Sequence, residues 1–226
     1  MRHSRKKVLL TGFEAYGYTP INPAESVARA LEGTTVGDAE IVSRIVPNTF
    51  FKCIDFVTAA IEEVQPELVV MMGEYGGRSM ITVERLAQNL NDGTRYGLTD
   101  NTGQSLQGEM TAKDGPVGYY ATLPVRAMVK AMRAAGVPAD ISDAGGTFCC
   151  NHLMYGVLHH IAQKQLPIRA GWIHLPFLPA VAAREENLGA PSMSVETAVT
   201  GVKTAIQAAL ENPEDINEAS VSRLLI

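Results

Sequence analysis

The chain has only three cysteines among its 226 residues, Cys53, Cys149 and Cys150. A small, odd number of cysteines is incompatible with the disulfide framework of a small secreted protein. A chain of this length also buries enough apolar surface to fold without a disulfide or a structural metal. These absences indicate a reducing, cytoplasmic setting.

Long apolar runs and an excess of positive charge are missing as well. No segment approaches the roughly 18 apolar residues that indicate a membrane-spanning helix. Only the short run "VLL" follows the basic start, which is too short for a secretory signal. The formal net charge of −5 argues against nucleic acid as the main partner. The basic cluster Arg2–Lys7 is interpreted as a solvated tail, and we expect neither a membrane nor a nucleic-acid partner.

Apolar strand-like runs alternate with segments of helical periodicity. The sequence predicts strands near residues 7–13, 40–47, 67–73, 139–142 and 168–176, and helices near residues 22–32, 50–64, 124–135, 151–163 and 194–210. The segment 79–90 is ambiguous, but its β-branched start favours a strand. Because the spacings are too long for hairpins, we expect a three-layer α/β/α sandwich with a mixed, largely parallel central sheet.

No internal repeat or low-complexity linker divides the sequence. We therefore expect a single domain over residues 1–226, in which the roles of a basic tail (1–6) and a C-terminal tail (about 212–226) stay open. The segment from residue 91 to residue 117 is polar and rich in glycine. It is longer than connectors usually are, which hints at function or mobility.

The first helix has a clear start signal. Asn22 is placed as the N-cap, Pro23 at the first helical position and Glu25 at the third. Gly33 follows the helix as a stop signal.

Ligands of such sheets bind beyond the carboxyl ends of the strands. Three segments deliver polar groups at strand ends of this kind, and they are Phe13–Tyr16, Cys149–His152 and His174. This convergence predicts a site at that edge of the sheet.

The stretch "GGTFCCNHLMYG" contains the two adjacent cysteines and admits several interpretations. Cys149, Cys150 and His152 lie too close together to ligate a metal tetrahedrally, and no CxxC pair exists for redox exchange. Both thiols could be buried core side chains, since free cysteine is commonly buried. Alternatively, a thiol at a helix start is activated by the helix dipole, and the free amides there can form an oxyanion hole. Cys150 is nearer the helix start, whereas Cys149 is better suited to packing against the sheet.

A nucleophilic cysteine needs a base, and the base needs an orienting acceptor. His174 ends an apolar strand and is the favoured base, although a hydrogen-bonded core histidine is the competing interpretation. His152 is expected to cap or pack. Glu84 lies among apolar neighbours and requires a partner, which could be the histidine or, as a plain salt bridge, Arg85. Neighbours on a strand point to opposite faces, which disfavours Arg85.

At this point the chain resembles a known family. The segments "VLLTGFEAYGYTPINPAES", "MMGEYGGRSMITVERLAQNLND", "GTFCCNHLMYGVLH", "GWIHLPFLP" and "PSMSVETAV" are similar to successive signatures of pyroglutamyl peptidase I, also called pyrrolidone-carboxylate peptidase. The resemblance extends from about Val8 to about Leu210, and five motifs in order are far more specific than any one of them.

The resemblance implies an activity and its residues. Members remove an N-terminal pyroglutamyl residue from peptides with a Cys–His–Glu triad, without a cofactor or metal, and are often tetrameric. The matching triad positions are Cys150, His174 and Glu84. The substrate ring is held between aromatic side chains, which correspond to Phe13, Tyr16 and Phe148, and the family's arginine corresponds to Arg95.

Three departures from the family pattern concern substrate binding more than the triad. The opening motif, usually TGFEPFGG, is TGFEAYGYT here, with Ala15 and Tyr16 in place of proline and phenylalanine. Glu74 stands where leucine or glutamine is commoner. Arg95 is shifted by one, so that Thr94 occupies the usual arginine position.

Two other functions stay open on the residues alone. One is a ligand-binding protein that has this fold and no turnover. The other is an amidase that uses the same triad on a different substrate.

Overall fold

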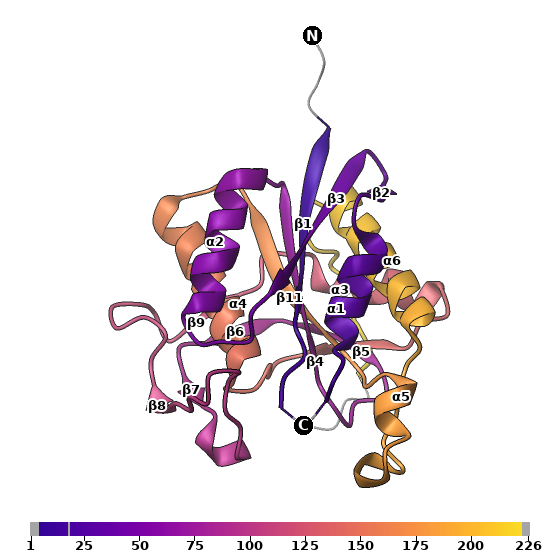
Figure 1. The fold of residues 1–226 in the computed structure, drawn as a ribbon. Helices are drawn as coiled ribbons and strands as arrows, with labels where there is room; N and C mark the ends of the chain where they lie inside the picture. Colours follow the sequence, from indigo (N-terminus) through magenta and orange to yellow (C-terminus); the bar gives the residue numbers. More distant parts are fainter. Residues whose placement is uncertain (1–4, 18, 223–226) are drawn as a thin grey trace.

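The computed structural model describes residues 5–17 and 19–222, and its centre is a seven-stranded sheet with the order β2–β3–β1–β4–β11–β5–β10 (Figure 1). The strands are β1 (Lys6–Phe13), β2 (Thr35–Val36), β3 (Ala39–Val46), β4 (Leu68–Glu74), β5 (Ile81–Glu84), β10 (Ala139–Ser142) and β11 (Arg169–Leu175). Strands β3, β1, β4 and β11 are parallel, β5 is antiparallel to β11, and β2 is antiparallel to β3. The expected mixed, largely parallel sheet is confirmed.

Five long helices cover the two faces of this sheet. They are α1 (Pro23–Leu31), α2 (Lys52–Val64), α3 (Val125–Ala134), α4 (Cys149–Lys164) and α6 (Val195–Glu211). Helices α1, α3 and α6 pack on one face, to the right in Figure 1, and α2 and α4 pack on the other. The arrangement is the expected three-layer sandwich. No helix within residues 5–17 and 19–222 is long and apolar enough to cross a membrane.

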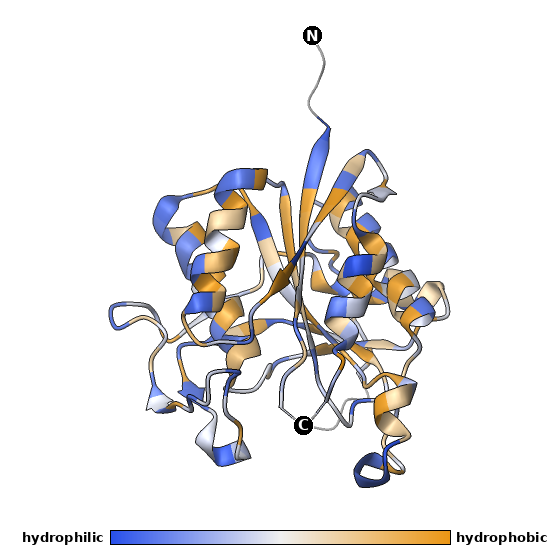
Figure 2. Cartoon of the chain, viewed as in Figure 1, coloured by the Kyte–Doolittle hydropathy of each residue, from blue (hydrophilic) through white to orange (hydrophobic). Residues whose placement is uncertain are grey.

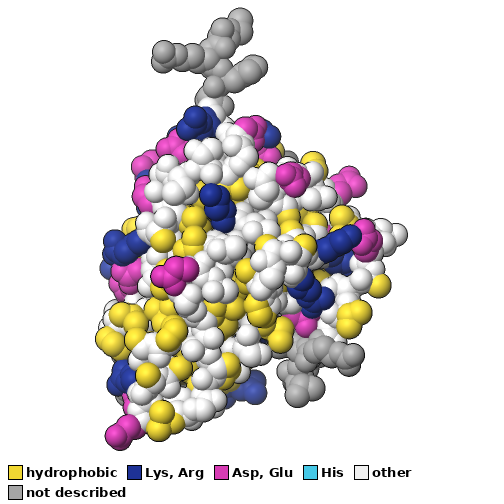
Figure 3. All heavy atoms as spheres, turned by 90° about the vertical axis from the view of Figure 1, so that its right-hand side faces the viewer, with side chains coloured by type: hydrophobic (Ala, Val, Ile, Leu, Met, Phe, Trp, Pro, Cys, Tyr) yellow, Lys and Arg dark blue, Asp and Glu magenta, His cyan; other side chains and the backbone are white. Residues whose placement is uncertain are grey.

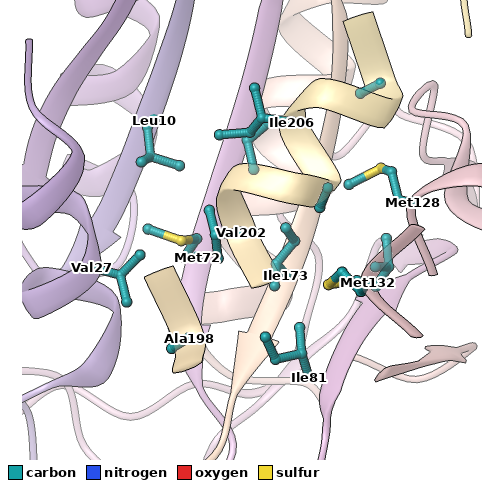
Figure 4. Close-up of a cluster of buried hydrophobic side chains, with 14 of the residues drawn as sticks. Leu10, Val27, Met72, Ile81, Met128, Met132, Ile173, Ala198, Val202 and Ile206 are labelled. Atoms are coloured by element: carbon teal, nitrogen blue, oxygen red, sulfur yellow. The ribbon is translucent and has the colours of Figure 1, made fainter. Parts of the chain in front are cut away.

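Alternating residues of the central strands supply the two cores. On β1, Leu10 faces α1 and α6, whereas its neighbour Leu9 faces α2 and α4. On β4, Met72 and Met71 divide in the same way, so that the middle parts of the central strands are largely apolar, as Figure 2 shows. Figure 4 shows the first core, where Leu10, Met72 and Ile173 of the sheet meet side chains of the covering helices such as Val202.

The expected start of α1 is confirmed. The side chain of Asn22 accepts a hydrogen bond from the amide of Ala24 at 2.9 Å. Glu25 does not close a capping box, because its carboxylate binds Arg29 at 2.8 Å one turn later. Gly33 follows the helix with a φ of 68°, the left-handed conformation that suits a residue without a Cβ.

The ambiguous segment 79–90 forms β5 and a separate short strand, β6 (Leu86–Gln88), which pairs with β9 (Gly118–Tyr120). The long polar segment that follows contains β7 (Asn91–Asp92), the 3₁₀ turn η1 (Thr94–Tyr96) and β8 (Gln107–Glu109). Elements of two or three residues bury too little apolar surface to leave a periodic signal in the sequence. The sequence interpretation missed them for this reason.

The described segments nearest the two termini both pack against the sandwich. Of the basic cluster Arg2–Lys7, residues 1–4 lie outside the described residues, and Lys6 already belongs to β1, where it pairs with Glu67 at 3.5 Å. The C-terminal tail crosses the start of α3. There Asp215 accepts hydrogen bonds from the amides of Arg126 and Ala127 at 3.1 and 3.0 Å, which caps a helix that has no side-chain cap of its own.

Candidate active site

The antiparallel strand β5 brings Glu84 next to His174, although the two residues are 90 positions apart in the chain. In this pairing Trp172 lies opposite Glu84 and His174 lies opposite Thr82. Diagonal neighbours on antiparallel strands share a face. The register therefore points the carboxylate and the imidazole toward each other.

Glu84 and His174 form a buried pair. Nδ1 of His174 lies 2.7 Å from Oε1 of Glu84, and the side chains are 1% and 0% exposed, respectively. Burial by itself would raise the pKa of Glu84, but the hydrogen bond and charge of His174, with the charge of Arg78, outweigh it and bring this pKa to about 2. The carboxylate is thus ionised and Nδ1 donates. The lone pair of His174 is then on Nε2, which has no hydrogen-bond partner among the described residues.

His174 is suited to act as a base near neutral pH. Burial lowers the pKa of its imidazole, and the Arg78 charge acts in the same direction, while Glu84 opposes both. The net shift is downward. A neutral imidazole with a free Nε2 can accept a proton, which is what general base catalysis requires.

Cys150 stands in the first turn of α4 and reaches the same pocket as His174. The N-cap residue, Phe148, provides no side-chain cap, so the first amides of the helix remain available to another acceptor. The thiol is 9% exposed. Its close approach to the sheet depends on Gly73, because a Cβ at that position would lie 2.9 Å from Sγ.

The expectation that the helix start lowers the pKa of this thiol is wrong. Burial raises the pKa of Cys150 above its ordinary value, and the charges of Glu84 and Glu74 add to the shift. Desolvation of the thiolate therefore outweighs the backbone hydrogen bond that lowers this pKa. Cys150 is a neutral thiol here and needs a base to remove its proton.

The pocket has a volume of about 210 Å³. It is lined by Tyr16, Glu74, Tyr75, Gly76, Tyr96, Leu98, Gly145, Gly146, Thr147, Phe148, Cys150 and His174. The rings of Tyr16 and Phe148 stand 6.1 Å apart between centroids. A small, flat, neutral ring fits such aromatic walls.

Two residues expected at the substrate site do not line this pocket. Phe13 is 1% exposed and packs on Trp172, with 5.6 Å between ring centroids. The rings of Trp172 and His174 lie 5.5 Å apart between centroids, so Phe13 lies one layer behind the pocket. Arg95 is exposed on η1, where its guanidinium lies 5.2 Å from the ring of Tyr96, which does line the pocket.

Arg78 is a site residue that the sequence interpretation missed. It donates to Oε1 of Glu84 at 2.7 Å and to the carbonyl oxygen of Ala144 at 3.2 Å. It also lies 3.7 Å over the ring of Tyr75. The buried carboxylate of Glu84 requires a positively charged partner, and only Arg85 was considered for this role from the sequence. Arg85 instead binds Asp143 at 2.6 Å.

The neighbours of Cys150 have structural roles. His152 is fully buried, and its Nε2 accepts a hydrogen bond from the amide of Phe51 at 2.9 Å, which ties α4 to the start of α2. Burial lowers the pKa of His152 to about 4. The expected packing role is confirmed. Cys149 is fully buried among the residues of the second core, and burial raises its pKa.

A second cavity, of about 880 Å³, adjoins the first across the turn formed by Tyr75 and Gly76. Arg78, Arg85 and Arg126 line it, but neither Cys150 nor His174 does. Within residues 5–17 and 19–222, no three His, Cys, Asp or Glu side chains are placed to share a metal ion.

A sequence model of the pyroglutamyl peptidase family matches residues 6–212. The chain belongs to the pyroglutamyl peptidase family. It is 64% identical to the pyrrolidone-carboxylate peptidase of Mycobacterium tuberculosis over 97% of this chain and 99% of the relative. It is 46% identical to pyrrolidone-carboxylate peptidase 2 of Photorhabdus laumondii over 94% of this chain and 95% of the relative.

Solved structures of this family have the same fold. Pyroglutamyl peptidase I from Bacillus amyloliquefaciens aligns with a TM-score of 0.91 and 36% identity, over 96% of this chain and all of that one. The pyrrolidone carboxyl peptidase from Thermococcus litoralis aligns with a TM-score of 0.89 and 35% identity, over 95% of this chain and all of that one. The chain is therefore a cysteine peptidase of the pyroglutamyl peptidase class, as the sequence motifs predicted.

Gly73→Ala tests the contact between the sheet and the candidate nucleophile. The added methyl group would lie 2.7 Å from the Trp172 ring and 2.9 Å from Sγ of Cys150, so one of them must move. We expect a loss of about 1–3 kcal/mol in the free energy of unfolding. We also expect about 100-fold slower hydrolysis of a pyroglutamyl chromogenic amide, the typical effect of a misplaced reacting atom.

The matched control is Gly145→Ala, measured by urea unfolding. A Cβ at Gly145 comes no closer than 3.6 Å to its neighbours, which is an ordinary contact. Its unfolding free energy should change by no more than about 0.5 kcal/mol. Equal destabilisation by Gly73→Ala and Gly145→Ala would show that the close contacts with Trp172 and Cys150 are not what requires glycine at position 73.

Proposed function

We propose that the chain hydrolyses the amide bond after an N-terminal pyroglutamyl residue through a thioester of Cys150. His174 serves as the base and Glu84 as its orienting partner. The observation that carries this proposal is the 2.7 Å Glu84–His174 pair. It leaves Nε2 of His174 without a partner in a pocket that also exposes Cys150.

The walls of the pocket suit the pyroglutamyl ring. The lactam is flat and carries no charge, so an acidic anchor for a free amino terminus would not hold it. Tyr16 and Phe148 offer aromatic faces to the ring. We propose that Phe13 supports His174 through Trp172, and that Arg95 acts through Tyr96.

The acylation step begins with proton transfer from Sγ of Cys150 to Nε2 of His174 as sulfur attacks the carbonyl carbon of the pyroglutamyl residue. The oxygen of the tetrahedral intermediate is placed to accept hydrogen bonds from the first amides of α4. When the intermediate collapses, the C–N bond breaks and the leaving amine takes the proton from Nε2. The products of this half are a thioester and a shortened peptide.

Deacylation repeats the same proton-transfer and attack steps, with water in place of the thiol. Nε2 of His174 accepts a proton from a water molecule that attacks the thioester carbonyl, and the C–S bond then breaks. The proton returns to sulfur, which restores the neutral thiol and releases pyroglutamate. Throughout, Glu84 holds the Nδ1–H tautomer and stabilises the imidazolium, and Arg78 keeps Glu84 ionised.

Substitution of the twin cysteines should have unequal effects. Cys150→Ala removes the sulfur that forms the thioester, and we expect kcat for a pyroglutamyl chromogenic amide to fall at least about 10⁴-fold. Cys149→Ala should retain most of the activity, because Cys149 packs in the core away from the pocket lining. Equal losses would contradict the assignment of the nucleophile.

The same assay separates the other candidate functions. A binding protein without turnover would hydrolyse no pyroglutamyl amide even at high enzyme concentration. An amidase of different specificity would hydrolyse other amides in preference. Alkylation should stop turnover by modifying Cys150 first, because Cys53 and Cys149 are fully buried.

Glu84→Gln should move the acid limb of the pH–rate profile to lower pH. His174 is active when neutral, so the rate falls as pH drops through the pKa of its imidazole. The Glu84 carboxylate raises the pKa of His174, so removal of this carboxylate lowers that pKa further. We also expect kcat to fall about 10²–10⁴-fold, because the tautomer is no longer held.

The control for this measurement is Asp143→Asn, which removes a half-exposed carboxylate that binds Arg85. Its acid limb should coincide with that of the unsubstituted chain. If Glu84→Gln leaves the acid limb of the pH–rate profile in place, Glu84 is not the partner that sets the pKa of His174.

We propose that residues 1–226 act as one domain in the cytoplasm, on N-terminally pyroglutamylated peptides. One sheet carries the whole candidate triad. The described cysteines are all free, which suits a reducing compartment. Membranes and nucleic acids are not among the proposed partners.

We further propose a homo-oligomer, and a tetramer as the family resemblance implies. Large apolar side chains are exposed on the surface, among them Val117 at 92%, Tyr120 at 72% and Leu188 at 72%. Figure 3 shows apolar side chains gathered between charged ones on the face that carries α6. Surfaces of this kind are typical of subunit contacts. Sedimentation equilibrium should give a multiple of the 24.3 kDa chain mass, and a monomer at micromolar concentration would contradict the proposal.

A further inference from the structure

Glu74 is a buried acid inside the candidate active site that has no partner among residues 5–17 and 19–222. It is the last residue of β4, is 5% exposed and lines the 210 Å³ pocket with Cys150 and His174. The structure gives its carboxyl group no hydrogen bond or ion pair with any described residue, and Oε2 is fully buried. A buried carboxylate without a partner is strongly disfavoured, so this group calls for a ligand.

The titratable and charged groups around Glu74 do not supply that partner. Tyr16 faces it from the loop after β1, Cys150 from α4, His174 from β11 and Tyr96 from η1. None of these four hydrogen-bonds to Glu74.

The cation closest in sequence, Arg78, is already engaged. It binds Glu84, Ser142 and the carbonyl oxygen of Ala144, and it stacks on Tyr75. Within the described part of the chain, Glu74 therefore faces the pocket without a countercharge.

A neutral carboxyl group complements the edge of a lactam. In a five-membered lactam, the N–H and C=O groups lie side by side, one donor and one acceptor. A protonated carboxyl group presents one acceptor and one donor in the reverse order, so that two hydrogen bonds can form at once. An ionised carboxylate presents only acceptors and would face the lactam oxygen with its negative charge.

We propose that Glu74 recognises the pyroglutamyl ring in its protonated form, donating to the lactam oxygen and accepting from the lactam N–H. This inference rests on the proposed function and adds to it a specificity-determining residue and a dependence on pH. Substrate binding then selects the neutral carboxyl group and holds its proton in the complex.

The environment of Glu74 supports a protonated form under ordinary conditions. Burial raises the pKa of this carboxyl group to about 7. The acid is neutral below that pH and ionises above it, so the form that binds substrate is lost as pH rises through about 7. KM should therefore rise toward alkaline pH, whereas kcat, measured with the site saturated, should change little from this cause.

The first test measures KM and kcat for a pyroglutamyl chromogenic amide between about pH 6 and 9. For the unsubstituted chain, KM should increase by up to tenfold for each pH unit above the pKa of Glu74. Glu74→Gln keeps one donor and one acceptor but cannot ionise, so its KM should stay flat over this range. Glu74→Leu should raise KM at every pH, also without a pH dependence.

Tyr16→Phe is the control for the buried phenol that also faces Glu74 in this pocket. It should keep the alkaline rise in KM, and loss of the rise would assign it to Tyr16 instead. A flat KM in the unsubstituted chain, or an unchanged rise in Glu74→Gln, would overturn the inference about Glu74. Absence of hydrolysis by the unsubstituted chain would instead reject the proposed function.

A second readout does not need turnover. Calorimetric binding of a pyroglutamyl peptide amide to Cys150→Ala, in buffers of different ionisation enthalpy, measures the protons taken up. At about pH 8, binding should take up close to one proton. The double substitution Cys150→Ala with Glu74→Gln should take up none, and equal uptake by both would overturn the inference.

Discussion

The buried hydrogen bond between Glu84 and His174 is the interaction on which the rest of the site depends. It exists because β5 runs antiparallel to β11 inside a sheet whose central strands are otherwise parallel. By fixing the proton on Nδ1, this bond leaves Nε2 free in the pocket that holds Cys150. The topology of the sheet thus selects the tautomer that the proposed chemistry needs.

Burial sets the ionisation of each group around this bond. Glu84 stays ionised because Arg78 and His174 both contact it, whereas Glu74, with no such partner, is held closer to neutrality. Cys150 is a neutral thiol because desolvation raises its pKa, as it raises the pKa of Glu74. Two carboxyl groups at the ends of nearby strands therefore have opposite properties, and the difference comes from the contacts that His174 and Arg78 make with Glu84. A buried ion pair contributes little net stability, so its value here is the ionisation state that it fixes.

Local signals in the sequence predicted most of the architecture. The cap at Asn22, the apolar run of β4 and the periodicity of α4 each depend on a few neighbouring residues, and each is where it was expected. The short strands β6 to β9 and the contact of Asp215 with α3 were not predicted, because their partners are distant in the chain. The same reason explains why Arg78 was missed, since its link to Glu84 depends on a turn whose path no local pattern reveals.

Among the candidate site residues, the motifs alone led us to predict Cys150 rather than Cys149 as the nucleophile, His174 rather than His152 as the base, and Glu84 as the acid. Residue type and position at strand or helix ends restrict chemistry, and five ordered motifs restrict it to one family. Distances, burial and ionisation required the folded chain. Only the tertiary structure placed Phe13 behind the pocket rather than in its wall, and left Glu74 without a partner among the residues that the structure describes. These properties depend on which atoms lie within a few ångströms, and such contacts join segments that are far apart in the sequence.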